Sequence, residues 1–149
     1  MGLFDFIKGA GRKEEAKKDE ERNELIKGNK LLRYVMSLGL DVEGLKVKYD
    51  DGVATVTGKA KSQADREKVV LALGNTDGVA QVDDQMEVAS PEAEAKFYTV
   101  QKGDSLSKIA KEAYGDAMKY PVIFEANKPM LTDPNLIYPG QVLRIPPAS

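Results

Sequence analysis

A seven-residue segment, SPEAEAK at 90–96, separates two parts of the chain in which helical and strand hydrophobic periods alternate. Proline, alanine and charged residues in such a segment are typical of a linker. Because both periods occur on each side of it, the sequence predicts the α+β class, with two small domains at 24–89 and 97–147. Residues 1–23 are expected to form an N-terminal segment followed by a charged helix or linker. The linker leaves little slack, so we expect the two domains to touch.

The domain at 24–89 is expected to have the order α-β-β-α-β. The expected elements are a helix at 25–38, a hairpin of strands at 45–49 and 53–57, a helix at 62–73 and a strand at 82–88. Ser62 can cap the second helix, and Gly74 occupies the place of a helix-ending C′ glycine. Asp50-Asp51-Gly52 suits the hairpin turn. Asp83 and Asp84 lack the spacing of a calcium loop, and we interpret them as a solvated strand face.

The domain at 97–147 is expected to have the order β-α-α-β. The expected elements are a strand at 97–100, a helix that follows Ser105, a second helix around 122–126 and a strand at 142–145. Gly115 ends the first helix, and Pro121 belongs near the start of the second. The Ser-x-x-Lys spacing at 105–108 is that of a serine acylase, but its companion motifs are absent and helix capping explains Ser105.

The chain has neither cysteine nor histidine among its 149 residues. Thiolate or imidazole catalysis and zinc sites of the usual kind are therefore excluded. Any bound metal must be a hard ion held by oxygen atoms. No pair of titratable residues lies in a catalytic motif, so we expect a protein that is not an enzyme.

The formal net charge of −2 argues against binding of nucleic acid through a bulk positive field. No apolar run is long enough for integral membrane insertion. The N-terminus MGLFDFIKGA lacks the pattern of an export signal, which predicts a cytoplasmic protein. Its large apolar residues could anchor the chain at a membrane surface, but nearby glycines make docking onto the protein the better interpretation.

Longer motifs carry a resemblance to known families. The sequences YTVQKGDSLSKIAKEAYGD, IFEANK and IYPGQVLRIP, in that order, resemble a LysM domain. VATVTG at 53–58 and LGNTDGVAQVDDQMEV at 73–88 resemble a BON domain. With MGLFDFIK in front of them, the two domains resemble the bacterial BON–LysM potassium-binding protein family over essentially the whole chain.

This resemblance implies selective binding of K⁺, and also of Rb⁺ and Cs⁺, in the cytoplasm. We expect the protein to be a monomer. The protein would act as a potassium sensor or buffer that becomes more ordered when the ion binds. In this family backbone carbonyls hold the ion, and position by position they fall on Ile7, Ala10, Gly74, Thr76, Gly78 and Val79. The side chains of Ile7, Thr76 and Val79 depart from the family pattern, which is acceptable where the ligands are carbonyls.

The chemistry of the turn is compatible with such a site. K⁺ is weakly hydrated, and rings of carbonyl dipoles replace its water without charged ligands. Glycine-rich backbone such as 74–78 and 9–11 can direct several carbonyls at one point. On the residues alone, a glycine after a helix is more simply a helix cap.

Two other functions remain open. LysM domains typically bind N-acetylglucosamine polymers such as peptidoglycan, which implies a groove between the turn at 103–106 and the loop at 131–137. The expected cytoplasmic location argues against this use, so we expect weak glycan binding at most. The BON domain could associate with phospholipid surfaces, but the chain has no basic cluster to favour it.

Overall fold

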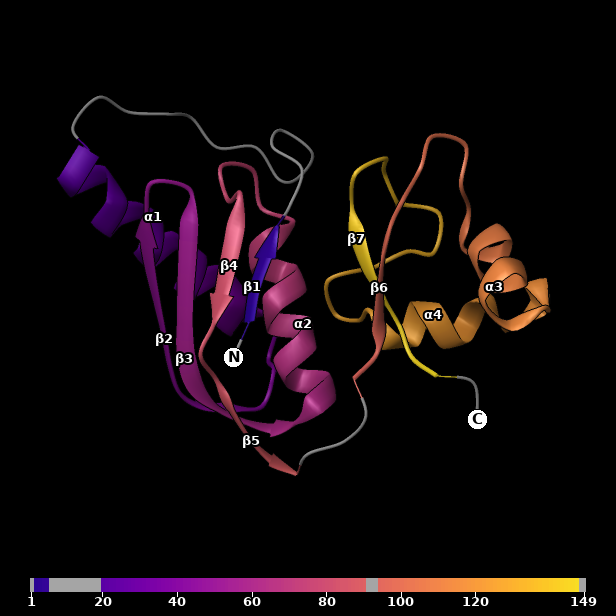
Figure 1. The fold of residues 1–149 in the computed structure, drawn as a ribbon, viewed down its shortest axis with the longest axis horizontal. Helices are drawn as coiled ribbons and strands as arrows, with labels where there is room; N and C mark the ends of the chain where they lie inside the picture. The colour runs from indigo at the N-terminus through magenta and orange to yellow at the C-terminus, as the bar shows by residue number, and fades with distance from the viewer. Residues whose placement is uncertain (1, 6–19, 91–93, 148–149) are drawn as a thin grey trace.

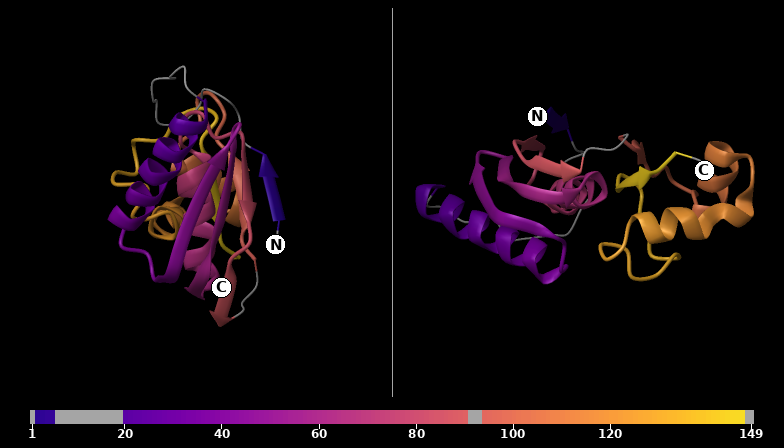
Figure 2. Two further views of the ribbon diagram at one scale, coloured as in Figure 1. Left: turned by 90° about the vertical axis from the view of Figure 1, so that its left-hand side faces the viewer. Right: turned by 90° about the horizontal axis from the view of Figure 1, so that it is seen from below.

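The computed structural model describes residues 2–5, 20–90 and 94–147 and confirms the α+β class (Figure 1). The first domain contains a sheet in the order β1-β4-β3-β2, with β5 also paired to β3. Its strands are β1 (Gly2–Asp5), β2 (Val42–Asp50), β3 (Val53–Ser62), β4 (Gln81–Asp84) and β5 (Glu87–Ser90). The helices α1 (Glu20–Ser37) and α2 (Gln63–Gly74) contact neighbouring strands and each other, so they cover the same face (Figure 2).

The core of this domain lies between the two helices and the sheet. Leu31 and Val35 of α1 meet Val56 of β3, Leu73 of α2 and Val82 of β4, all at most 1% exposed. Burial of such side chains stabilises each by about 1.5–3 kcal/mol relative to exposure. The predicted hairpin is correct but longer than expected, and its register shifts between Glu43 and Lys46.

The N-terminal strand β1 pairs antiparallel with β4. Phe4 packs against Phe97 of the second domain, with ring centroids 5.6 Å apart. Docking of the N-terminus onto the protein is therefore confirmed for residues 2–5. Phe6 and Ile7 lie outside the described residues.

The strand expected at 82–88 is wrong as a single element. It is divided into β4 and β5, which both pair parallel with β3. The division follows Asp84, which is 3% exposed and accepts a hydrogen bond from Arg66 Nε at 2.7 Å. Its other carboxylate oxygen accepts the Met86 N–H at 3.0 Å. A solvated face is therefore the wrong interpretation of Asp84, since a buried ion pair holds it.

The end of α2 also differs from expectation. Gly74 is the last helical residue, and the C-cap is Asn75 with φ −84°. The left-handed glycine of this turn is Gly78, with φ +91°. The Asn75 N–H donates to Leu71 O, which completes the helical bonding without a glycine at C′.

The second domain has the predicted β-α-α-β order with a short 3₁₀ turn inserted. Its elements are β6 (Lys96–Thr99), α3 (Leu106–Tyr114), η1 (Ala117–Lys119), α4 (Tyr120–Ala126) and β7 (Val142–Ile145). Ser105 caps α3 by accepting the Lys108 N–H, and Gly115 ends it in the left-handed conformation. Pro121 lies in the first turn of α4, as predicted.

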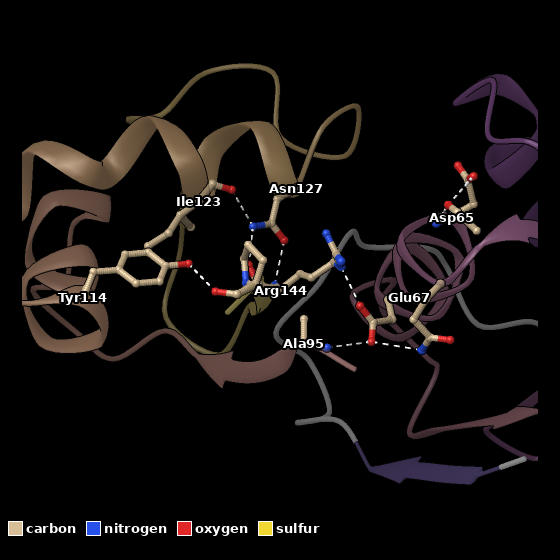
Figure 3. A network of polar contacts seen from close by, with 10 residues as sticks. Asp65, Glu67, Ala95, Tyr114, Ile123, Asn127 and Arg144 are labelled. Atoms are coloured by element: carbon tan, nitrogen blue, oxygen red, sulfur yellow. Dashed lines mark hydrogen bonds and ion pairs between the residues drawn. The ribbon is translucent and has the colours of Figure 1, made fainter. Parts of the chain in front are cut away.

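The two domains touch along α2 and β7, which confirms the contact expected from the short linker. Arg144 Nε of β7 donates to Glu67 Oε1 of α2 at 2.6 Å (Figure 3). Glu67 also accepts the Ala95 N–H at 3.0 Å and a hydrogen bond from Gln63 at 3.1 Å. A second contact lies at the other end of α2, where Asn75 meets Val142.

Candidate functional site

The turn at 74–79 follows α2 and leads to β4. Four of the six predicted carbonyl residues lie in it: Gly74, Thr76, Gly78 and Val79. Gly74, Thr76 and Val79 are buried, whereas Gly78 is exposed. The other two, Ile7 and Ala10, lie outside the described residues. The last carbonyls of a helix have no intrahelical donor and carry partial negative charge, so the position suits a cation.

The carbonyls of this turn differ in how they are already used. Thr76 O accepts the Val79 N–H at 3.2 Å, and Gly78 O accepts the Tyr49 hydroxyl at 2.8 Å. Within the described residues, no donor is recorded for the carbonyls of Gly74 and Val79. A peptide oxygen has two lone pairs, so one hydrogen bond still leaves capacity for an ion.

A side-chain ammonium group already lies on this turn. Lys27 Nζ of α1 donates to Asp77 O at 2.8 Å and lies 5.7 Å from the centroid of the Tyr49 ring. A Cβ built on Gly78 would come within 2.9 Å of the same nitrogen, so a glycine lets the ammonium approach. The turn therefore binds a monovalent cationic group through backbone oxygen. Sequence reasoning missed Lys27 and Tyr49, since neither is near the turn in the chain.

The side chains of Thr76 and Asn75 make hydrogen bonds within the protein. The Thr76 hydroxyl donates back to Ala72 O at 3.0 Å. The Asn75 amide pairs with the backbone of Val142, and Tyr138 OH approaches Asn75 O at 3.4 Å. The peptide oxygens of Gly74 and Val79, which accept no hydrogen bond among the described residues, are of the ligand type that the family resemblance implies.

Acidic metal sites are not found in the part of the chain that the structure describes. No group of three or more aspartate or glutamate residues there is arranged to hold a metal ion. Ca²⁺ prefers several carboxylates, whereas K⁺ is held by carbonyl oxygens without charged ligands. The peptide oxygens of the turn are of the donor type that holds K⁺.

The two segments expected to form a glycan groove, at 103–106 and 131–137, each contain short-range hydrogen bonds. Asp104 accepts the Tyr98 hydroxyl at 2.6 Å and the Gln101 N–H at 2.8 Å. The bond from Tyr98 holds the pKa of Asp104 below its usual range and raises the pKa of Tyr98 to about 12. In the segment at 131–137, Asp133 accepts the Asn135 N–H at 2.8 Å.

A pocket of about 290 Å³ lies at the boundary between the domains. Tyr34 and Asn75 line it from one side, and the loop from Met130 to Gln141 lines it from the other. Gln141 Oε1 is buried without a hydrogen-bond partner among the residues that the structure describes. Burial raises the pKa of Tyr138, which also lines the pocket, to about 12.

Across residues 2–5, 20–90 and 94–147, no helix combines the length and apolar character needed to cross a bilayer.

Family models match both parts of the chain: the BON domain at residues 31–90 and the LysM domain at residues 98–146. The chain is 46% identical over 147 residues to the potassium binding protein Kbp of Escherichia coli O6:H1, covering 98% of this chain and 99% of that protein. It is also 57% identical over 49 residues to an uncharacterized protein of Deinococcus radiodurans, covering 33% of this chain and 19% of that protein. With the esterase Rv1288 of Mycobacterium tuberculosis it shares 50% identity over 48 residues, 32% of this chain and 10% of that protein.

The two partial relationships leave most of each relative unmatched, so they carry no activity to this chain. The match to Kbp extends over nearly all of both proteins, and the BON domain precedes the LysM domain as the motifs predicted. The chain therefore belongs to the bacterial BON–LysM family of potassium-binding proteins.

Proposed function

We propose that this protein binds K⁺, and also Rb⁺ and Cs⁺, as a non-enzymatic cytoplasmic sensor or buffer. The observation that carries the proposal is the turn at 74–79, where the peptide oxygens of the buried residues Gly74 and Val79 accept no hydrogen bond among the described residues. The near full-length similarity to a protein named for potassium binding supports the choice of ion.

In this proposal the ion is held by the carbonyls of the turn together with those of Ile7 and Ala10. The pairing of β1 with β4 and the contact of Phe4 with Phe97 bring the start of the chain to the first domain's sheet. An ion that binds only the assembled form stabilises that form by mass action, so binding would increase order. The protein acts as a monomer, with domains at 24–89 and 97–147 and a linker at 90–96.

Thermal unfolding in matched KCl, NaCl and choline chloride tests the function. At a K⁺ concentration about 100 times Kd, binding stabilises the folded protein by about 2.7 kcal/mol. For a chain of this size, that raises Tm by about 5–10 °C. We expect this rise in KCl and not in NaCl or choline chloride, which control for ionic strength. Equal melting temperatures in all three salts would contradict the proposal.

Weak glycan binding through the LysM domain is the second candidate, supported by the family match at 98–146. Its groove would use the turn at 103–106 and the loop at 131–137. Titration with chitin and peptidoglycan oligomers, monitored by NMR, should shift the amide signals of those two loops. Unchanged loop signals at millimolar oligomer would exclude this candidate.

A further inference from the structure

Two asparagine side chains cover the edge of β7 that does not pair with β6. Asn127 Nδ2 donates to Arg144 O at 2.9 Å, and Arg144 N–H donates to Asn127 Oδ1 at 2.7 Å (Figure 3). Asn75 makes the same pair of bonds with Val142, both at 2.8 Å. A primary amide offers one donor and one acceptor side by side, as a neighbouring strand would. Each asparagine thus replaces one residue of a missing strand.

The two asparagines differ in where they come from. Asn127 follows α4 and belongs to the same domain as β7. Asn75 caps α2 in the other domain and stands between Gly74 and Thr76, two of the proposed ligand residues. Both side chains are in buried residues, 1% exposed for Asn127 and 8% for Asn75. The first domain therefore supplies part of the edge of the second domain's sheet.

We infer that Asn75 is a positioning residue for the ion-binding turn and that it links ion binding to docking of the LysM domain. Its side chain is fixed at both ends of the amide by the Val142 backbone, which in turn fixes the peptide groups on either side of Asn75. The first of these peptide groups carries the carbonyl of Gly74, which is a proposed ligand. The second carries the carbonyl of Asn75 and the amide nitrogen of Thr76, so it orients the residues that follow in the turn. The inference rests on the proposed function.

Thermodynamic linkage predicts how docking of the LysM domain and K⁺ binding affect each other. If docking of β7 onto Asn75 orders the turn, docking raises the affinity of the turn for K⁺. By reciprocity, K⁺ must then strengthen docking by the same factor. A variant that releases Asn75 from β7 lowers the apparent affinity in proportion to the fraction of ordered turn that is lost.

The matched test compares Asn75→Ala with Asn127→Ala. Both remove an amide from the same strand edge, but only the first lies in the turn. We expect Asn75→Ala to raise the Kd for K⁺ by about fivefold or more, a typical coupling factor. Asn127→Ala should leave Kd within about twofold of the unmodified protein. Both variants should be destabilised in NaCl, and only Asn75→Ala should lose part of the extra stabilisation that KCl provides.

A second control keeps the test decisive if Asn127→Ala unfolds the LysM domain, which circular dichroism would show. Glu67→Gln disturbs the other end of the α2–β7 contact and leaves Asn75 in place. We expect its Kd to rise less than that of Asn75→Ala, because docking is weakened while the turn keeps its own bonds to β7. A Kd for Asn75→Ala within twofold of the unmodified protein, or an equal loss in Glu67→Gln, would overturn the role of Asn75.

Docking itself can be measured because the chain contains no cysteine. Dyes on Lys61→Cys and Met118→Cys, both at exposed positions in different domains, report the distance between the domains by energy transfer. Addition of KCl should narrow the distance distribution, and Asn75→Ala should remove this response. A K⁺ response retained in Asn75→Ala would contradict the inference. Absence of K⁺ binding by the unmodified protein would instead remove the proposed function, and the inference with it.

Discussion

Gly78 has a backbone conformation, φ +91°, that residues with a Cβ rarely adopt. A side chain there would also come within 2.9 Å of the Lys27 ammonium nitrogen. We expect Gly78→Val to destabilise the protein by about 1–2 kcal/mol through backbone strain. Since the turn must change to accommodate valine, we also expect weaker K⁺ binding, measured by calorimetric titration.

Gly39→Val is the matched control for this prediction. Gly39 belongs to the same domain and has φ +70°, but a Cβ on it would meet nothing within 4 Å. The strain should be similar, while K⁺ binding should be unchanged. If both variants bind K⁺ as the unmodified protein does, Gly78 is not part of the site.

Residues whose roles depend on near neighbours in the chain were predictable from sequence. Ser62 and Ser105 cap helices because each accepts an N–H three residues later. Gly74 was expected to be a C′ glycine, but it is the last helical residue, and the C-cap is Asn75, whose side chain bonds Val142, 67 residues away. A carbonyl site has no side-chain signature, so the six ligand residues came from family resemblance and remain a prediction.

The Tyr98–Asp104 hydrogen bond predicts how stability depends on pH. The pKa of Asp104 is lowered in the folded protein. Its contribution to the free energy of unfolding is therefore present above the pKa of the unfolded chain and is lost as pH falls through the pKa of the folded protein. Tyr98 has a raised pKa of about 12, so its contribution is present below pH 10 and is lost as pH rises toward 12. Denaturant midpoints should therefore fall at both extremes.

Tyr98→Phe removes the donor from this pair. The variant should lose stability near neutral pH and show a weaker decline in acid than the unmodified protein. On the alkaline side it should keep part of the decline, because burial also raises the pKa of Tyr138 to about 12. If stability declines in acid equally in Tyr98→Phe and in the unmodified protein, the hydrogen bond does not lower the pKa of Asp104.

At the scale of elements, the sequence predicted the number and order of the regular segments in the LysM domain well. Ser105, Gly115 and Pro121 mark helix ends through local backbone chemistry. The division of 82–88 into β4 and β5 was not predictable, because it depends on Arg66 of α2 reaching Asp84. From hydrophobic periodicity alone, a charged residue in a strand is expected to be exposed, because its partner in another element is not known.

This division gives a stability prediction. The side chains of Asp84 and Arg66 are 4% and 18% exposed, so removing the carboxylate leaves a mostly buried guanidinium without its partner. We expect Asp84→Ala to lower the free energy of unfolding by about 3–5 kcal/mol, measured by urea denaturation. Asp83→Ala is the adjacent control, and since Asp83 makes an exposed bond to Gln85, its effect should stay within about 0.5 kcal/mol. Equal effects of the two substitutions would show that the ion pair has no special role.

At the scale of the whole molecule, the short linker predicted that the domains touch, and the contact along α2 and β7 confirms it. The residues that make the contact were not predictable. Glu67 and Arg144 are 77 positions apart, and each resembles an ordinary solvent-facing charge within its own element. Their burial, 5% and 9% exposed, arises only when the two domains pack together.

The Glu67–Arg144 pair predicts how the domains unfold together. We expect Glu67→Ala to cost about 3–5 kcal/mol, because it leaves the Arg144 guanidinium buried and unpaired. The loss falls on the contact between the domains, so we expect one calorimetric transition for the unmodified protein and two for Glu67→Ala. It should also release the Ala95 N–H, which now donates to Glu67.

Replacing both charged residues tests whether the ion pair stabilises the contact between the domains. In Glu67→Met with Arg144→Met no charge remains unpaired, and apolar side chains of similar length fill the space. We expect this double variant to be more stable than either single variant, since desolvation offsets much of the attraction in a buried ion pair. The coupling energy from the double-mutant cycle should exceed about 0.5 kcal/mol, the limit for independent sites. Additive losses of unfolding free energy would mean that the two side chains act separately. The contact between the domains would then depend on Asn75 and backbone contacts alone.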